Sequence, residues 1–111
     1  MRLYALALGT ALWREGEKKQ AEESFQLAAK LYPLDPTPVF NLAMIELARD
    51  KPDYKSALKK LRAALEMGMK YELASSVARR NIIKCLTAMG RIMEAETERK
   101  KLVWESQKWQ P

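Results

Sequence analysis

The sequence predicts an all-α protein that stacks three antiparallel helix hairpins. Strong helix formers, chiefly Leu, Ala, Lys, Glu, Arg and Met, dominate the 111 residues, whereas β-branched residues are few and do not alternate. Only 4 Gly and 5 Pro occur, and they are clustered, so they separate segments of helical length. A two-helix pattern of small and large apolar residues near the N-terminus returns twice along the chain, which indicates a repeated unit.

The first hairpin is the most regular of the three. Its helices are expected over residues 3–14 and 18–32, with Gly16 in the turn between them and Pro33 after the second helix. Small residues stand where two helices must approach closely, and large apolar residues stand on the inner faces. These positions are Ala5, Leu8, Gly9, Leu12, Ala21, Phe25, Ala28 and, at the end of the stripe, Leu31. One such hairpin cannot bury both of its apolar faces, so further hairpins should pack against it.

The second hairpin begins at Asp35, which can cap a helix that starts with Pro36 and extends to about residue 49. A turn follows at residues 50–53, and Asp53 can cap the second helix, which ends at a glycine. The inward residues are Leu42, Ala43 and Leu47 in the first helix and Ala57, Leu61, Ala64 and Leu65 in the second. Lys55, Lys59 and Arg62 are expected to lie together on another side of that helix.

The third hairpin is expected to have helices over residues 73–89 and 91–108. Gly90 separates them in the manner of a C-terminal glycine cap. The inward residues of the first helix are Ile82, Ile83 and Leu86, and the apolar residues of the second are Ile92, Ala95, Leu102 and Val103.

Equivalent positions of the hairpins lie at a regular spacing. Gly9 and Ala43 are 34 residues apart, and Ala43 and Ile83 are 40 apart, with the extra residues in the turn at 50–53 and the linker at 69–72. A helix hairpin that repeats at 34 residues with this signature resembles the tetratricopeptide repeat (TPR) family. The resemblance implies a right-handed superhelical stack of three antiparallel helix hairpins. It also implies a single domain over residues 1–111, with repeats at about 2–34, 35–69 and 73–108.

The resemblance weakens toward the C-terminus. Glu46 stands where the family pattern has an aromatic residue, Ile83 fills the position of the small residue, and Arg99 fills a second aromatic position. Together with Lys100 and Lys101, Arg99 suits a helix whose outer face meets water at the end of an array.

The TPR family implies a function in binding. Its members bind peptides or helices in a concave groove lined by the first helix of each hairpin, so the resemblance implies a non-catalytic, adaptor-like or chaperone-like scaffold for another protein. Helical periodicity maps the groove to Leu3, Leu6, Thr10, Trp13, Thr37, Phe40, Asn41, Met44, Val77, Arg80, Asn81 and Lys84. The first two helices offer apolar and aromatic surface and the third offers positive charge and an amide. We therefore expect a partner segment with hydrophobic anchors and an acidic end.

One recognition mode of the family is disfavoured. Some members grip a C-terminal carboxylate with a set of Lys, Asn and Arg residues in the groove. Only Asn41 falls at a matching position here, because Leu6, Thr10 and Val77 occupy positions where that set needs Lys or Asn.

An enzyme or a cofactor protein is not indicated. The chain has no His, no Gly-rich phosphate loop, no nucleophile motif and no cluster of metal ligands. Its one cysteine, Cys85, excludes an internal disulfide and lies in an apolar helical stretch, so we expect a buried thiol. A lone thiol is compatible with a reducing compartment, and we expect a cytoplasmic protein. The uncharged run at residues 3–13 is too short to span a membrane.

The charge distribution leaves an alternative partner open. Residues 1–50 carry 6 basic and 7 acidic side chains, and residues 51–111 carry 14 and 7, so the net charge of +6 lies in the second half. A basic half can bind nucleic acid or an anionic surface, although no nucleic-acid motif or aromatic stacking platform accompanies it. The other interpretation of these basic residues is an ordinary solvated helical surface with no ligand.

The three tryptophans also leave alternatives open. Trp13 is expected either to pack under the first turn or to face the groove. Trp104 and Trp109 lie near the C-terminus, where exposure would favour a homodimer contact, another partner or a further repeat. Packing back onto the helix that holds Ala57 and Leu61 is the other alternative.

Overall fold

The described part of the protein is an array of six α-helices. A computed structural model describes residues 2–69 and 72–108, with the side chains of residues 5–69 and 75–104. The helices are α1 Arg2–Arg14, α2 Lys18–Leu31, α3 Pro36–Leu47, α4 Tyr54–Glu66, α5 Glu72–Ala88 and α6 Ile92–Lys108, and the described part contains no strand. All six lie within a few residues of the ranges expected from the sequence.

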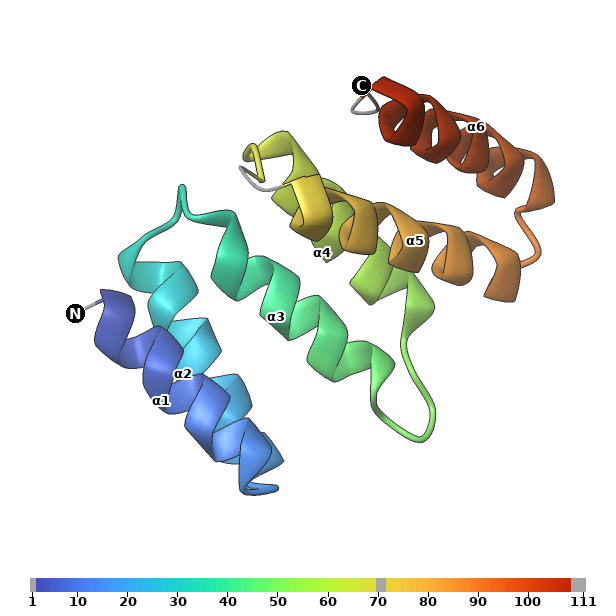
Figure 1. Cartoon of the computed structure of the whole chain (residues 1–111). Coiled ribbons are helices and arrows are strands. Elements are labelled where there is room, and N and C mark those ends of the chain that lie inside the picture. Colours follow the sequence, from blue (N-terminus) through green and yellow to red (C-terminus); the bar gives the residue numbers. More distant parts are fainter. Residues whose placement is uncertain (1, 70–71, 109–111) are drawn as a thin grey trace.

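Each helix packs against the next one along the chain, and the strongest contacts are within the pairs α1–α2 and α3–α4. Figure 1 shows α1, α3 and α5 toward the viewer, with α2 and α4 behind them, and α1 and α6 at opposite ends of the array. The predicted all-α helical repeat is therefore confirmed. None of the described helices is long and apolar enough to cross a membrane.

Local sequence signals set the helix ends. The Asp35 carboxylate accepts a hydrogen bond from the Thr37 N–H at 3.0 Å, and the Asp53 carboxylate accepts one from the Ser56 N–H at 3.1 Å, so both predicted N-caps are confirmed. Gly90 ends α5 with a positive φ of 76°, a conformation that glycine adopts without steric cost.

The short turns at residues 15–17 and 89–91 are closed by the backbone in the same way. In the first, the Glu17 N–H donates to the Leu12 carbonyl and the Gly16 N–H donates to the Trp13 carbonyl. In the second, the Arg91 N–H donates to the Leu86 carbonyl and the Gly90 N–H donates to the Thr87 carbonyl. This pair of bonds is the Schellman arrangement, and it satisfies carbonyls that the helix end leaves open.

Close packing of α1 on α2 depends on a glycine. A Cβ atom added to Gly9 would lie 2.7 Å from the ring of Phe25, which is itself almost fully buried. Phe25, Ala21 and Ile45 form the smaller of two buried clusters, which joins α2 to α3. The larger cluster extends from α3 to α6 around Leu61 and Ile82.

Two leucines are more exposed than the sequence suggested. Leu8 is 39% exposed, although the equivalent residues Leu42 and Ile82 pack against the clusters of the preceding hairpins. In the described residues, Leu8 packs in neither of the two clusters. Leu31 is 46% exposed because it is the last residue of α2, where the chain leaves the helix pair.

The third hairpin replaces the apolar contact of the other two with a charged one. Ile83 fills the small position and packs partly against the larger cluster, while the guanidinium of Arg99 pairs with Glu96 on the surface of α6. A largely buried ion pair joins the two helices instead, with Arg79 Nη1 2.6 Å from Glu98 Oε2. In the first hairpin the large side chain of this pair of positions, Phe25, belongs to the second helix and faces Gly9. In the third hairpin the large apolar side chain, Ile83, belongs to the first helix.

Candidate functional site

A trough runs between α1 and α3 and is made of two adjoining hollows. One has a volume of about 420 Å³ and the other about 320 Å³. Thr10 on α1 and Asn41 on α3 line both of them. The first is also lined by Leu6, Ala7, Ala11, Arg14 and Thr37, and the second by Trp13, Phe25, Met44, Ile45 and Ala48. The structure thus brings together Leu6, Thr10, Trp13, Thr37, Asn41 and Met44, six of the residues that the sequence assigned to the groove.

The second hollow is the apolar part of the trough. Phe25 and Ile45 belong to the smaller buried cluster, and Trp13 packs against that cluster from the side. Met44 and Ala48 complete the lining with a flexible thioether and a methyl group. An aliphatic or aromatic side chain of a ligand would replace water there without losing a hydrogen bond.

Two polar groups differ in their availability at the junction of the hollows. The Thr10 hydroxyl donates to the Leu6 carbonyl of its own helix at 2.9 Å. The side-chain amide of Asn41 makes no hydrogen bond with any other described residue, and it is only partly buried. Its N–H₂ and C=O groups can therefore pair with the backbone of an extended ligand.

Trp13 combines the two placements that the sequence left as alternatives. Its indole packs on the cluster under the first turn and also forms a wall of the apolar hollow. The Lys18 ammonium lies 5.9 Å from the centre of the ring, within the range of a cation–π contact. The ring lies between the apolar hollow and a more polar one that includes Lys18, Lys19 and Arg49.

The remaining predicted groove residues are not joined to this trough. Phe40 packs against the larger core cluster, and the α5 residues Val77, Arg80, Asn81 and Lys84 line neither hollow. The Asn81 amide donates to the Val77 carbonyl at 2.8 Å, so this amide is already engaged within its helix. Leu3 lies outside the residues whose side chains are described.

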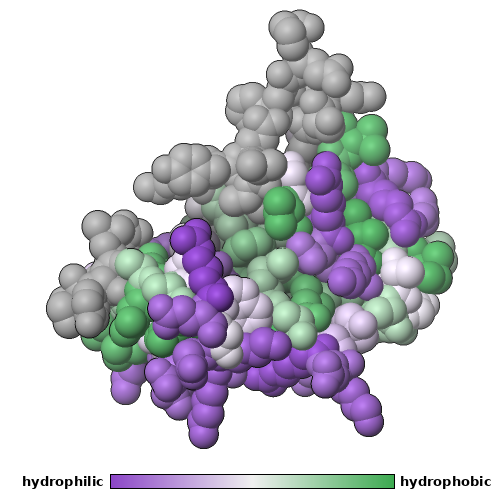
Figure 2. Space-filling model, turned by 60° about the horizontal axis from the view of Figure 1, so that its bottom comes forward, coloured by the Kyte–Doolittle hydropathy of each residue, from purple (hydrophilic) through white to green (hydrophobic). Residues whose placement is uncertain are grey.

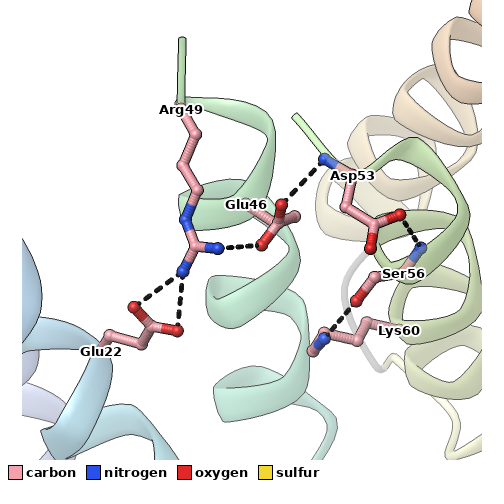
Figure 3. A network of polar contacts seen from close by, with 6 residues as sticks. All are labelled: Glu22, Glu46, Arg49, Asp53, Ser56 and Lys60. Carbon is pink, nitrogen blue, oxygen red and sulfur yellow. Dashed lines mark hydrogen bonds and ion pairs between the residues drawn. The ribbon is translucent and has the colours of Figure 1, made fainter. Parts of the chain in front are cut away.

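A polar network beside the trough connects α2, α3 and the start of α4. Arg49 Nη2 lies 2.9 Å from each carboxylate oxygen of Glu22 on α2, and Arg49 Nη1 lies 2.7 Å from Glu46 Oε2 on α3. The other oxygen of Glu46 accepts the Asp53 N–H at 2.8 Å, just before α4 (Figure 3). Glu46 is almost fully buried, so this residue of the second repeat replaces an aromatic contact with a bridging carboxylate.

The network ends on α4, where the Lys60 ammonium donates to the Ser56 hydroxyl at 2.8 Å. The chain of contacts therefore links the first hairpin, through α2, to both helices of the second (Figure 3). A search of the sequence for acid–base pairs at helical spacing finds Glu46 with Arg49 but cannot find Glu22.

The surface alternates in hydropathy (Figure 2), and the one cysteine is buried. Figure 2 shows hydrophobic side chains in patches between hydrophilic ones, with a hydrophilic lower edge. Among the described residues, no group of three or more His, Cys, Asp and Glu side chains could hold a metal ion. Cys85 is buried as expected, and its burial raises the pKa of the thiol, which disfavours the reactive thiolate.

At the C-terminal end, Trp104 is 62% exposed, so most of its ring is not packed back on α4. Trp109 lies outside the described residues.

Comparison with known proteins places the fold. No family model matches the sequence, and no curated protein matches it. Among solved structures, the chain is similar to the second TPR of Spaghetti (RPAP3), which was solved bound to the HSP90 peptide SRMEEVD. The match has a TM-score of 0.76 at 20% identity and covers 93% of this chain and 90% of that chain. The six-helix array described above is therefore the tetratricopeptide repeat fold.

Proposed function

We propose that this chain is a non-catalytic interaction scaffold that binds a peptide or helical segment of another protein in the trough between α1 and α3. The observation that carries the proposal is the shared position of Thr10 and Asn41, which makes one continuous surface of the two hollows. The structural neighbour, bound to a peptide in its solved structure, supports a protein as the partner. The repeats would be residues 2–34, 35–69 and 73–108 of a single domain.

The chemistry of the trough defines the segment that fits it. An aliphatic or aromatic side chain would occupy the hollow above Phe25 and Ile45, and the neighbouring peptide bond would pair with the Asn41 amide. Acidic residues on one side of this anchor would approach Arg14, which lines the other hollow. On α5, Arg80 and Lys84 are exposed and would attract an acidic end at longer range.

The HSP90 peptide of the neighbour is a useful negative probe. Leu6, Thr10 and Val77 stand where a carboxylate-gripping groove needs Lys or Asn, so only Asn41 remains of that set. We expect SRMEEVD to bind this chain at least tenfold more weakly than peptides selected for its own trough.

The experiment selects ligands from a random peptide display library with the full chain as bait. Selected peptides should share a hydrophobic anchor, and calorimetry should show at least tenfold weaker binding to Met44→Glu and to Asn41→Ala. Leu27→Glu, an exposed leucine on α2 away from the trough, is the control and should bind normally. Equal affinity of the selected peptides for Met44→Glu and the wild type would contradict the proposal, provided that circular dichroism shows both chains folded.

A further inference from the structure

Another hollow, called the α4 hollow below, lies along α4 and shares no lining residue with the trough. Its volume is about 700 Å³, and most of its lining comes from one stripe of α4. Lys55, Lys59 and Arg62 follow one another at steps of four and three residues, so their side chains project from the same face of the helix. Arg91, from the turn between α5 and α6, adds a fourth cation at the rim.

The cations on α4 form no direct ion pair within the described part of the protein. Lys55, Lys59 and Arg62 make no hydrogen bond or salt bridge with another described residue. Arg91, by contrast, is paired with Glu94 of α6, and this hydrogen-bonded contact lowers the pKa of the Glu94 carboxyl. Lys55 and Lys59 are exposed on consecutive turns and repel each other in the unliganded state, whereas Arg62 is half-buried and its charge also helps to lower the pKa of Glu94.

The floor and the rim add features that distinguish between ligands. Leu58, which is almost fully buried, and Ala63 give the hollow an apolar floor. Asp53 and Glu66 stand at the two ends of the α4 stripe. A nucleic-acid backbone would bring phosphates against both of these carboxylates, and neither an aromatic residue for base stacking nor a nucleic-acid motif lines the hollow.

We propose that the α4 hollow is a second docking surface, which binds an acidic amphipathic helix of a partner protein. Carboxylates at steps of four and three residues on that helix would pair with Lys55, Lys59 and Arg62 over about two turns, or roughly 10 Å. An apolar side chain between them would cover Leu58 and Ala63. The surface is independent of the trough, so one chain can hold two protein segments at once.

The test uses a synthetic, fluorescently labelled helical peptide with Glu at positions i, i+4 and i+7 and Leu between them. Fluorescence anisotropy should show saturable binding to the full chain that weakens as salt rises, because the charged contacts are screened. The triple variant Lys55→Glu, Lys59→Glu, Arg62→Glu should bind the peptide at least tenfold more weakly. A control peptide has the same composition but contiguous Glu residues. It should bind the wild-type chain no more tightly than the original peptide binds the triple variant.

The matched control is the triple variant Lys19→Glu, Lys30→Glu, Lys100→Glu, which changes the net charge by the same amount at exposed sites on other helices. It should retain the affinity of the wild type within about twofold. Equal losses in the two triple variants would overturn the proposal, since net charge alone would then explain binding. Tighter binding of a DNA duplex than of the peptide, abolished by the α4 variant alone, would overturn it in favour of nucleic acid. Circular dichroism verifies that both variants are folded.

Discussion

The carboxylate of Glu46 lies 2.8 Å from the backbone nitrogen of Asp53 and closes the turn between α3 and α4. Replacing Glu46 by Ala leaves this N–H without its acceptor in a partly buried site and frees Arg49 from one of its two carboxylates. The free energy of unfolding should fall by about 1–3 kcal/mol, the usual cost of a buried unsatisfied donor. Urea unfolding followed by circular dichroism measures the change.

Glu23→Ala is the control, because Glu23 is exposed on α2 and makes no contact in the network. Glu46→Gln keeps an acceptor oxygen for Asp53 and should cost less than Glu46→Ala. A stability of Glu46→Ala equal to that of Glu23→Ala would show that water replaces the carboxylate.

Because Gly9 contacts Phe25, the effect of Gly9→Ala on stability should change sign when the Phe25 ring is removed. Gly9→Ala should destabilise the wild-type protein by about 1 kcal/mol, because overpacking outweighs the helix propensity gained. In a Phe25→Leu background the ring is absent, so the same substitution should stabilise the protein by up to about 1 kcal/mol. Thermal unfolding of the four proteins of this double-mutant cycle measures both values. A destabilisation of equal size in the two backgrounds would show that the glycine is required for another reason.

Burial of Cys85 gives a dependence of stability on pH. Burial raises the pKa of the thiol in the folded state, so this group contributes stability fully at pH values below its unfolded pKa of about 8.5. As the pH rises from there through the folded pKa, the unfolded chain loses the proton first and the contribution is lost, by at most about 1.4 kcal/mol per pH unit.

The measurement is the difference in urea-unfolding free energy between wild type and Cys85→Ala at pH 7 and pH 9.5. That difference should become smaller at the higher pH. The same burial should make alkylation of the native thiol much slower than that of the urea-unfolded chain. Rapid native alkylation with a constant difference in stability would show that the thiol reaches solvent.

One stripe of α6 differs from its counterpart on α4 by a single ion pair. Four residues of α6 have apolar counterparts on α4 that belong to the larger core cluster or pack against it. Ile92, Glu96, Arg99 and Val103 correspond to Tyr54, Leu58, Leu61 and Leu65, respectively. Replacing both Glu96 and Arg99 by Leu should create a continuous apolar stripe and cause self-association. Analytical ultracentrifugation over a range of concentrations tests this.

The control variant replaces Glu94 and Lys101 by Leu, since these exposed residues lie on a different side of α6 and carry the same pair of charges. It should sediment like the wild type. Equal association of the two double variants would indicate that added hydrophobicity, and not this stripe, drives it.

The sequence was sufficient for the helices and their pairing because those depend on local chemistry. The side chains of Asp35 and Asp53 bond to backbone N–H groups two and three residues away. Gly90 has its positive φ just after the end of α5. The hairpin signature likewise needs only helical spacing, as the contact of Gly9 with Phe25 illustrates.

Contacts between distant residues were not predictable in this way. The pairs Glu22–Arg49 and Arg79–Glu98 depend on how hairpins and helices cross, which no helical period encodes. For the proposed groove, spacing selected three described α1 residues and three α3 residues that line the trough. It could not tell that the Asn81 amide would bond within its own helix while the Asn41 amide would stay available. Phe40 packs against the larger core cluster, which also depends on how the helices cross and not on helical spacing.

The way in which each turn is closed sets how freely its length can change. The turns at residues 15–17 and 89–91 are held by two backbone bonds each, and one inserted residue would break both. The turn at residues 48–53 is closed by a side chain, because the carboxylate of Glu46 in α3 accepts a hydrogen bond from the N–H of Asp53. Extra residues placed between Arg49 and Asp53 should extend outward and leave the contact of Glu46 with Asp53 in place. The middle hairpin is thus a place where we expect this scaffold to accept a grafted loop or a protease site while its helices keep their register.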